Sequence, residues 1–333
     1  MPSHIAIDGR ISTVPARVLA CGSDVAVKSK LIVNPTAGTD TAPDHLETMN
    51  RLLRRRIGRL DIVITVSEGD ATDAAAQAVE DGYDHLFVAG GDGTLNESLN
   101  GVARVDGGLD AITFGVIPLG TGNDFATALG LPEDVEAAID LLLASEASRV
   151  DVGRLNDRYF VNVSAGGFLA EVSDAVNPRL KTLAGKLAYL IGGAQVLMDY
   201  EPVHARLRRA EGDEEMALYA FAVCNSRLIG GGRLIAPDAV IDDGELDVCL
   251  IQAMPTLEFL ALLRRVSEGD HVDDDRVAYF RTREVELIFD RPIKVNFDGQ
   301  VLEAERCRYR IMPRAARFLG VGRVPQKNEQ GPL

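Results

Sequence analysis

Residues 87–97 read Phe87-Val88-Ala89-Gly90-Gly91-Asp92-Gly93-Thr94-Leu95-Asn96-Glu97, an apolar run that ends in three glycines within four residues. Because glycine has no Cβ, the backbone can turn tightly there and bring its N–H groups close to an anion. Thr94 and Glu97 have the spacing of a capping box, which predicts that a helix starts at Thr94. The stretch therefore indicates a strand, a phosphate-binding turn and a helix. The alternative is a plain strand-to-helix turn in which Asp92 is only a turn residue.

Two further loops of the same character follow apolar runs. Residues 117–125 read Ile-Pro-Leu-Gly-Thr-Gly-Asn-Asp-Phe, and residues 34–39 read Asn-Pro-Thr-Ala-Gly-Thr. Ligands of open α/β sheets bind beyond the carboxyl ends of the strands. Three such loops at one edge fit a nucleotide whose phosphates are wrapped by backbone amides and small hydroxyls. Asp92 suits this site if it holds a metal ion that bridges to the phosphate oxygens.

Several other kinds of site do not match the sequence. None of the three loops carries a lysine, and the pattern G-x-x-x-x-G-K-[ST] is absent, so the site is not a P-loop. The five histidines are scattered, and no G-x-S-x-G or H-E-x-x-H motif is present. Hydrolytic triads and zinc chemistry are therefore not expected.

The hydrophobic periodicity changes along the chain. The first half alternates Val- and Ile-rich runs with amphipathic stretches, which is typical of parallel strands connected by helices. From about Arg149, short apolar runs dominate and several alternate with polar residues, which predicts a second, β-dominated domain built as a sandwich. The expected strands are 31–33, 61–66, 85–89, 112–117, 150–152, 159–163, 203–207, 218–223, 246–251, 285–289, 293–297 and 308–312, and the expected helices are 44–56, 71–79, one from 94, 135–144, 180–198 and 256–266.

Composition narrows the class of protein. The chain of 333 residues has 35 Lys plus Arg against 50 Asp plus Glu, a net charge of −15, which argues against a nucleic-acid-binding surface. Its four cysteines, at 21, 224, 249 and 307, are too few and too separated to be a disulfide framework, so we expect reduced thiols and a cytoplasmic protein. The most apolar segment, 187–198, is shorter than the roughly 20 residues of a membrane-spanning helix.

Taken together, the three loops resemble the signature loops of the diacylglycerol kinase catalytic domain family. The closer likeness is to soluble bacterial lipid kinases related to sphingosine and ceramide kinases. It continues through 152–154, 159–163, 230–232, 236–239 and 242–248, and so covers roughly residues 28–318. Gly-Gly-Asp-Gly alone also occurs in NAD kinases and phosphofructokinases, whereas the ordered combination is specific.

The resemblance implies a fold, α/β plus β, and a set of ligands. An N-terminal three-layer α/β domain at 28–148 would bind ATP with Mg²⁺, and a C-terminal β-sandwich at 149–318 would bind the lipid in the cleft between them. Residues 1–27 and 325–333 are poorly patterned. Asp92 would act through a magnesium and water network. The nucleotide contacts carried over by position are Asn34, Gly38, Thr65, Gly91, Asp92, Gly93, Thr94, Leu95, Asn96, Glu97, Thr121 and Asn123.

The resemblance also implies a second, structural magnesium. In the family it is held by an aspartate and two backbone carbonyls in the turn before a strand. The matching positions are Asp243 and the carbonyls of Val240 and Glu245. From spacing alone, Asp242-Asp243-Gly244 is better explained as a plain turn between strands.

One position departs from the family. The family's Asp-Gly-Glu motif, whose glutamate is the proposed general base, reads Asp298-Gly299-Gln300 here. An amide cannot accept the proton, so Gln300 cannot be that base. Three explanations are open: Asp298 or Asp92 takes the proton, the acceptor needs no base, or the protein binds nucleotide and lipid without turnover. Asp298-Gly299 is in any case expected at a hairpin turn.

The sequence thus predicts a lipid kinase that moves the γ-phosphoryl group of MgATP to a hydroxyl of a diacylglycerol-like or sphingoid lipid. The alternatives are a weak or inactive nucleotide- and lipid-binding protein and an NAD kinase-like enzyme. Expected partners are the lipid, with transient contact at the inner membrane surface, and a second copy paired through a sandwich edge strand. The basic segments 51–59 and 206–209 are first interpreted as solvated faces, and as membrane contacts only if they lie on the side of the cleft.

Overall fold

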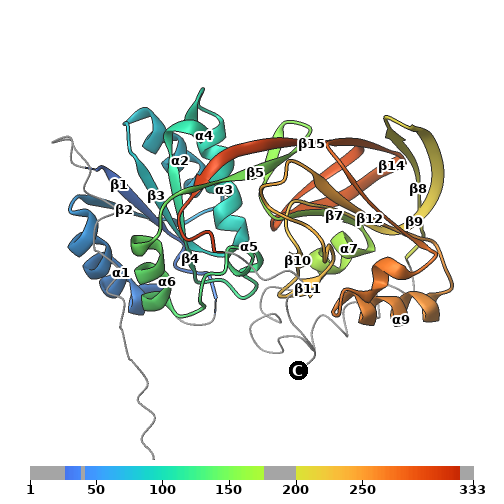
Figure 1. The fold of residues 1–333 in the computed structure, drawn as a ribbon, viewed down its shortest axis with the longest axis horizontal. Helices are drawn as coiled ribbons and strands as arrows, with labels where there is room; N and C mark the ends of the chain where they lie inside the picture. Colours follow the sequence, from blue (N-terminus) through green and yellow to red (C-terminus); the bar gives the residue numbers. More distant parts are fainter. Residues whose placement is uncertain (1–26, 39–41, 176–199, 323–333) are drawn as a thin grey trace, which may run out of the picture.

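The computed structural model describes residues 27–38, 42–175 and 200–322, which form two adjoining halves (Figure 1). The helix predicted at 180–198 and Cys21 lie outside the described residues. Within the described part, no helix is long and apolar enough to cross a membrane. Cys224, Cys249 and Cys307 are buried free thiols, as expected.

The first half is built on a parallel sheet in the order β2-β1-β3-β4. Its central strands are buried apart from the half-buried His85 at the start of β3, which explains their apolar sequences. Helices cover both faces, with α1 packed on α6 and α2 on α3 (Figure 1). The elements are β1 (Ser29–Val33), α1 (Ala42–Ile57), β2 (Leu60–Ile64), α2 (Asp70–Glu80), β3 (His85–Gly90), α3 (Asp92–Ala103), α4 (Gly108–Ala111), β4 (Thr113–Pro118), α5 (Asp124–Ala128) and α6 (Val135–Ala144).

The second half is antiparallel and rich in strands. Its sheet continues in the order β13-β12-β9-β7-β14-β15, with β8 on β14 and β9, and β5 on β15 and β6. The elements are β5 (Ser148–Leu155), β6 (Arg158–Phe160), β7 (Val163–Gly167), α7 (Phe168–Ala175), β8 (Val203–Arg209), β9 (Gly212–Cys224), β10 (Leu228–Ile229), β11 (Arg233–Leu234), β12 (Leu246–Gln252), α9 (Thr256–Val266), a 3₁₀ turn (Asp270–Asp273), β13 (Val277–Thr282), β14 (Glu284–Phe297) and β15 (Gln300–Phe318).

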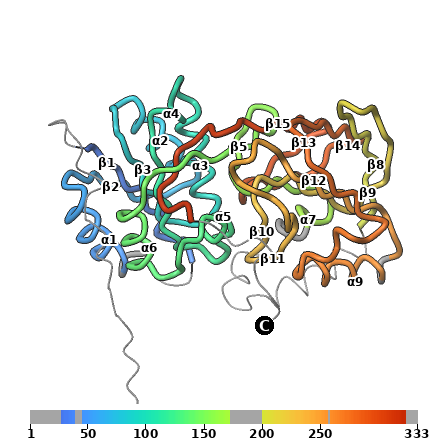
Figure 2. The backbone as a smooth tube through the Cα atoms, viewed as in Figure 1, coloured from blue at the N-terminus to red at the C-terminus, as the bar shows by residue number. Residues whose placement is uncertain are grey.

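The last strand joins the two halves. β15 begins in a hairpin with β14, runs beside β5, and ends parallel to β4, where Phe318 pairs with Phe114 (Figure 2). The Phe318 ring stacks on Phe114 at 5.1 Å and meets Phe125 edge-on at 5.3 Å between centroids. The core of the first half is therefore completed by a residue from the far end of the chain.

Most predicted elements are present, but some boundaries were wrong. The strands expected at 285–289 and 293–297 are one strand, β14, whose pairing with β15 shifts register between Ile288 and Ile293. The run 159–163 is divided between β6 and β7. The predicted capping box of Thr94 and Glu97 was also wrong. Helix α3 starts at Asp92, after Gly91, and Glu97 instead accepts a hydrogen bond from the Gly69 N–H.

Candidate functional site

The three glycine loops meet at the carboxyl edge of the parallel sheet. A Cβ on Gly38 would lie 2.1 Å from the Leu119 carbonyl oxygen, and one on Gly120 would lie 2.6 Å from the Cα of Gly91. Real Cβ atoms do not approach so closely, so the backbones can touch only because these residues are glycine. The three loops, separate in the sequence, therefore form one continuous surface of backbone.

Side chains lock the loops to each other. The Asn34 amide Nδ2 donates to Thr94 Oγ1 at 3.0 Å, and Asn34 Oδ1 accepts from the N–H of Thr36 at 3.0 Å. Asn123, which has a φ of +50°, accepts from the Gly120 N–H at 2.9 Å and donates to its carbonyl at 2.7 Å. Asn34 and Asn123 thus shape the cradle in this structure, whatever else they contact.

Asp92 lies where two of the loops meet. Its two carboxylate oxygens accept from the N–H groups of Asp124 and Phe125, each at 3.1 Å, at the start of α5. Burial, together with the negative charge of Asp124, raises the pKa of Asp92. The Asp92 N–H also hydrogen-bonds its own carboxylate, so three donors leave one of the about four lone-pair sites for another partner.

A loop of the second half closes on the same place. The Asp124 carboxylate accepts from the N–H groups of Gly231 and Gly232 at 2.8–3.1 Å, and Asp124 itself is buried. Sequence reasoning gave Asp124 no role in the site and included these glycines only in the family likeness and in a segment, 225–234, expected to line the cleft. The signal was available, because Asp124 follows Asn123 directly and Gly230–Gly232 is a run of three glycines, but the contact joins residues 107 and 108 positions apart.

Mg²⁺ is usually bound by one or two carboxylates together with substrate phosphates and water. Asp92 and Asp124 provide two carboxylates beside a backbone cradle, so this donor set fits a magnesium nucleotide. No three His, Cys, Asp or Glu side chains in the described ranges come together as a metal site on their own. A cation here would therefore depend on the phosphates for its remaining ligands.

Asp298 cannot be the replacement base proposed from the sequence. Its Oδ2 accepts from the Val161 N–H at 2.7 Å and the Asn96 amide at 3.3 Å, and its Oδ1 accepts from the N–H groups of Asn162 and Val163 at 3.1 and 2.9 Å. A carboxylate has about four lone-pair sites, and these four donors fill them. Burial raises the pKa of Asp298 to about 7 although these donors lower it. Asp298 therefore joins α3, the link 161–162 and β7 as a structural carboxylate.

Gln300 lies beside the cradle. Its side-chain Nε2 is 3.4 Å from Glu97 Oε1, and it lies 3.9 Å from where a Cβ of Gly93 would stand. Burial raises the pKa of Glu97, whose other oxygen accepts from the Gly69 N–H at 3.1 Å. Gln300 thus lies near the start of α3, with its amide in contact with an acid.

Other predicted nucleotide contacts are placed differently. The side chain of Leu95 belongs to the apolar core, and that of Asn96 is 1% exposed and donates to the Tyr159 carbonyl and Asp298. Both side chains are therefore directed into the protein rather than toward a ligand, because they lie on the buried face of α3. Thr65 is buried at the end of β2 with its N–H bonded to the Val33 carbonyl, and Thr121 is exposed.

An arginine of β13 contacts the turn expected to hold the structural magnesium. Asp243 Oδ1 accepts from the Glu245 N–H at 3.0 Å, and its Oδ2 accepts from the Arg281 guanidinium. The same guanidinium contacts the Glu245 carboxylate at 3.2 Å. Each Asp243 oxygen already has one donor, and the fixed positive charge of Arg281 lies beside them. A magnesium ion held by Asp243 with the carbonyls of Val240 and Glu245 would be repelled by that charge and does not fit this structure.

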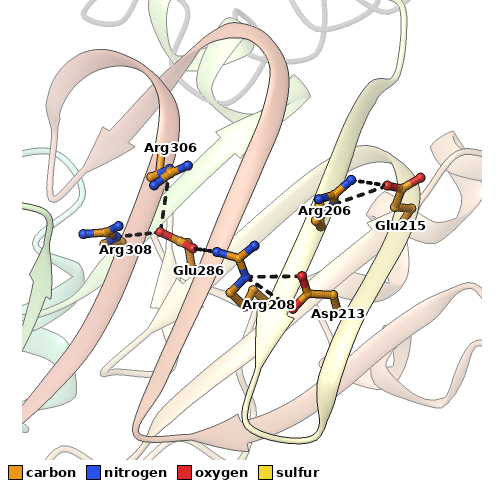
Figure 3. Close-up of polar contacts among 7 residues, drawn as sticks. All are labelled: Arg206, Arg208, Asp213, Glu215, Glu286, Arg306 and Arg308. Carbon is orange, nitrogen blue, oxygen red and sulfur yellow. Dashed lines mark hydrogen bonds and ion pairs between the residues drawn. The ribbon is translucent and has the colours of Figure 1, made fainter.

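The two basic segments do not form one surface. The segment 51–59 lies on and after α1 and the segment 206–209 on β8, at opposite ends of the molecule (Figure 1). Arg206 pairs with Glu215 at 2.7 Å, and Arg208 pairs with both Asp213 and Glu286 (Figure 3). These side chains are half-exposed and ion-paired, which agrees with their interpretation as a solvated face.

The parallel sheet with its glycine loops, closed by a strand-rich second half, defines a two-part α/β protein of the kinase type. The diacylglycerol kinase catalytic domain family matches residues 28–155, and the YegS C-terminal NAD kinase beta sandwich-like domain matches residues 162–320. The chain belongs to the diacylglycerol kinase family. The resemblance seen in the loops and the fold class of α/β domain plus β-sandwich are therefore confirmed.

Named relatives agree with this assignment. A diacylglycerol kinase of Bacillus subtilis (strain 168) is 32% identical over 274 residues, covering 82% of this chain and 89% of that protein. One of Staphylococcus saprophyticus is 34% identical over 278 residues, covering 82% and 88%. A crystal structure described as a diacylglycerol kinase from Bacillus anthracis str. Sterne has the same fold, with a TM-score of 0.74 at 24% identity over 88% of this chain and 96% of that chain.

Proposed function

We propose that this protein transfers the γ-phosphoryl group of MgATP to a hydroxyl of a diacylglycerol-like or sphingoid lipid. The observation that carries the proposal is the pair Asp92 and Asp124, placed between the glycine cradle of the first half and the loop 230–232 of the second. Such a position suits phosphoryl transfer, which depends mainly on aligning the two substrates and neutralising charge. Family membership supports a kinase, and the lipid acceptor is the proposed refinement.

In this mechanism the glycine cradle binds the phosphates of the nucleotide, and the two carboxylates orient the magnesium ion. Backbone N–H groups of the loops would hold the phosphates, and Asp92 and Asp124 would hold the Mg²⁺ that neutralises charge on the phosphate oxygens. The lipid hydroxyl oxygen forms the new bond to the γ-phosphorus, the bond from the γ-phosphorus to the β–γ bridging oxygen breaks, and ADP leaves. The hydroxyl proton would go to the Asp92 carboxylate where the cation leaves one of its lone pairs free, and otherwise to solvent water.

The absence of a base at Gln300 predicts a slow enzyme. General-base catalysis typically contributes about 10²- to 10⁴-fold, and a loose phosphoryl-transfer transition state needs less of it than most reactions. The alternative is a protein that binds nucleotide and lipid without turnover. Two observations favour this alternative: the four lone-pair sites of Asp298 are filled, and residue 300 is an amide. Each removes an expected proton acceptor.

The test is phosphate transfer from labelled MgATP to a panel of diacylglycerol, sphingoid and ceramide lipids in mixed micelles, with NAD as a further acceptor. We expect label in at least one lipid and none in NAD, and we expect Asp92→Asn to lose at least about 10²-fold of the rate. Asp134→Asn, at the distant α6 cap, is the matched control and should keep the rate. Calorimetric binding of ATP and lipid without label transfer would establish the binding protein instead.

A further inference from the structure

Three acidic side chains surround one arginine at the start of β12. The Arg281 guanidinium contacts Asp243, lies 3.2 Å from Glu245 Oε2, and approaches Asp247 Oδ2 at 3.8 Å. The pairing of β12 with β13 sets this arrangement, because Asp247 and Arg281 are directly opposite in the antiparallel register. The cluster thus follows from the strand register and from the alternation of acids at 243, 245 and 247.

Two of the three acids, Asp243 and Asp247, are each also held by one neutral donor. Asp243 Oδ1 accepts from the Glu245 N–H at 3.0 Å, and Asp247 Oδ1 accepts from the Tyr279 hydroxyl at 2.6 Å. The Asp247 side chain is 1% exposed, so its charge needs a partner within the protein. The oxygens left over, Asp243 Oδ2 and Asp247 Oδ2, are the ones directed to Arg281, whose planar fork of five donors can serve several carboxylates at once.

The turn that carries this cluster is hydrogen-bonded to the connection between the two halves. Asp151 of β5 accepts from the Gly244 N–H and the Arg314 N–H, both at 2.6 Å, and its own N–H donates to the Ile241 carbonyl at 2.7 Å. Asp151 therefore ties the turn 240–245 to β5 and β15, the strands that pass from one half to the other. Whatever neutralises this acidic turn also stabilises that junction.

We propose that Arg281 is the resident cation of this turn and that the chain uses its guanidinium in place of a structural metal ion. A divalent cation bound to the Asp243 carboxylate would lie against the fixed positive charge of Arg281. The arginine also satisfies Glu245 and Asp247, which a single small ion at Asp243 would leave to water. The stability of the fold is then independent of divalent cations.

The experiment measures thermal unfolding in excess EDTA and in millimolar Mg²⁺, without nucleotide, with every protein in an Asp92→Asn background so that the nucleotide site does not contribute. We expect the midpoint of the parent to be the same in both buffers. Arg281→Met should lower it by roughly 5 °C in EDTA, and Mg²⁺ should restore part of that loss. Adding Asp243→Asn should abolish the restoration, because the metal loses its carboxylate.

The matched control is Arg283→Met, which removes the same charge from an exposed side chain two residues further on. We expect neither a large loss nor a response to Mg²⁺. The proposal fails if the parent is stabilised by Mg²⁺ and Asp243→Asn removes that effect, or if Arg281→Met unfolds like the parent in both buffers. If Arg281→Met does not fold, titration calorimetry of the parent with Mg²⁺ tests the proposal instead. Binding of Mg²⁺ to the parent that is lost in Asp243→Asn would contradict it.

Discussion

Gln300 lies close to an acid as well as to the cradle. Its amide nitrogen is 3.4 Å from Glu97 Oε1, and burial already raises the pKa of Glu97. A glutamate at this position would place two carboxylates side by side, and each negative charge would raise the pKa of the other. The neutral amide avoids that repulsion and instead gives Glu97 a hydrogen-bond donor. The departure from the family motif is therefore compatible with a well-formed site.

This geometry makes the Gln300→Glu variant informative. If the site lacks only its base, we expect phosphate transfer to be faster than in the parent by up to about 10²-fold. The gain should increase as the pH rises, because the new carboxyl group and the Glu97 carboxyl group together lose their shared proton. Initial rates from pH 6 to 9 measure it. Gln300→Ala is the control, since it removes the amide without adding an acid and should show no gain. Equal rates for Gln300→Glu and the parent at every pH would show that another group accepts the proton.

At the scale of elements, the outer faces of β8, β14 and β15 carry a ladder of charges. Glu286 is the centre of it, with Arg308, Arg208 and Arg306 around one side chain that is 11% exposed (Figure 3). The hydrogen bond from Arg308, aided by the nearby positive charges, lowers the pKa of Glu286. The strand register, Glu286 opposite both Arg208 and Arg308, positions the ladder.

Replacing the central acid should destabilise the sheet. We expect Glu286→Gln to cost about 1 kcal/mol at pH 7, because Arg306 and Arg308 lose their acidic partner and Arg208 keeps only Asp213. Because the pKa of Glu286 is lower in the folded than in the unfolded protein, its charge stabilises the fold at pH values above the unfolded-state pKa. The difference in stability between variant and parent should therefore disappear as the pH falls below about 4.3. Urea unfolding between pH 3 and 7 measures this. Glu284→Gln, whose pair with Arg310 is about two-thirds exposed on both sides, should change little at any pH. A cost for Glu286→Gln that does not vary with pH would contradict the electrostatic explanation.

At the scale of the whole molecule, the two halves share a sheet and exchange core residues. β15 pairs with β14 and β5 in the second half and with β4 in the first. Phe318, fully buried, stacks on Phe114, while Asp151 and Asp298 bind backbone N–H groups from several strands at the junction. These contacts predict that the halves unfold together rather than one after the other.

A pair of core truncations tests this cooperativity. Phe318→Ala and Phe289→Ala each remove a buried ring, from the first and second core respectively, and each should cost about 3 to 5 kcal/mol. Scanning calorimetry should show a single transition that moves to lower temperature in both variants. Two transitions would show that the halves are thermodynamically independent, if each substitution moves only the transition of the half that contains it.

Local sequence patterns were enough for much of the fold and for the location of the site. Val- and Ile-rich runs, an alanine-rich helix and the turn glycines act over a few residues, so strands, helices and the cradle follow from neighbouring side chains. The helix ends were less predictable, because Thr94 and Glu97 have a capping pattern while the fold gives Glu97 a different donor, the Gly69 N–H.

What the sequence by itself determined was the family, the order of elements and the three loops whose glycines allow backbones to touch. Only the tertiary structure decided which carboxylates remain available. Asp298 is filled by donors more than 130 positions away along the chain, Asp124 is held by the loop 230–232, and Asp243 meets an arginine 38 positions later. The physical reason is that a side chain's protonation and ligand-binding capacity depend on the donors and charges packed around it, and strand register brings these together from distant parts of the chain.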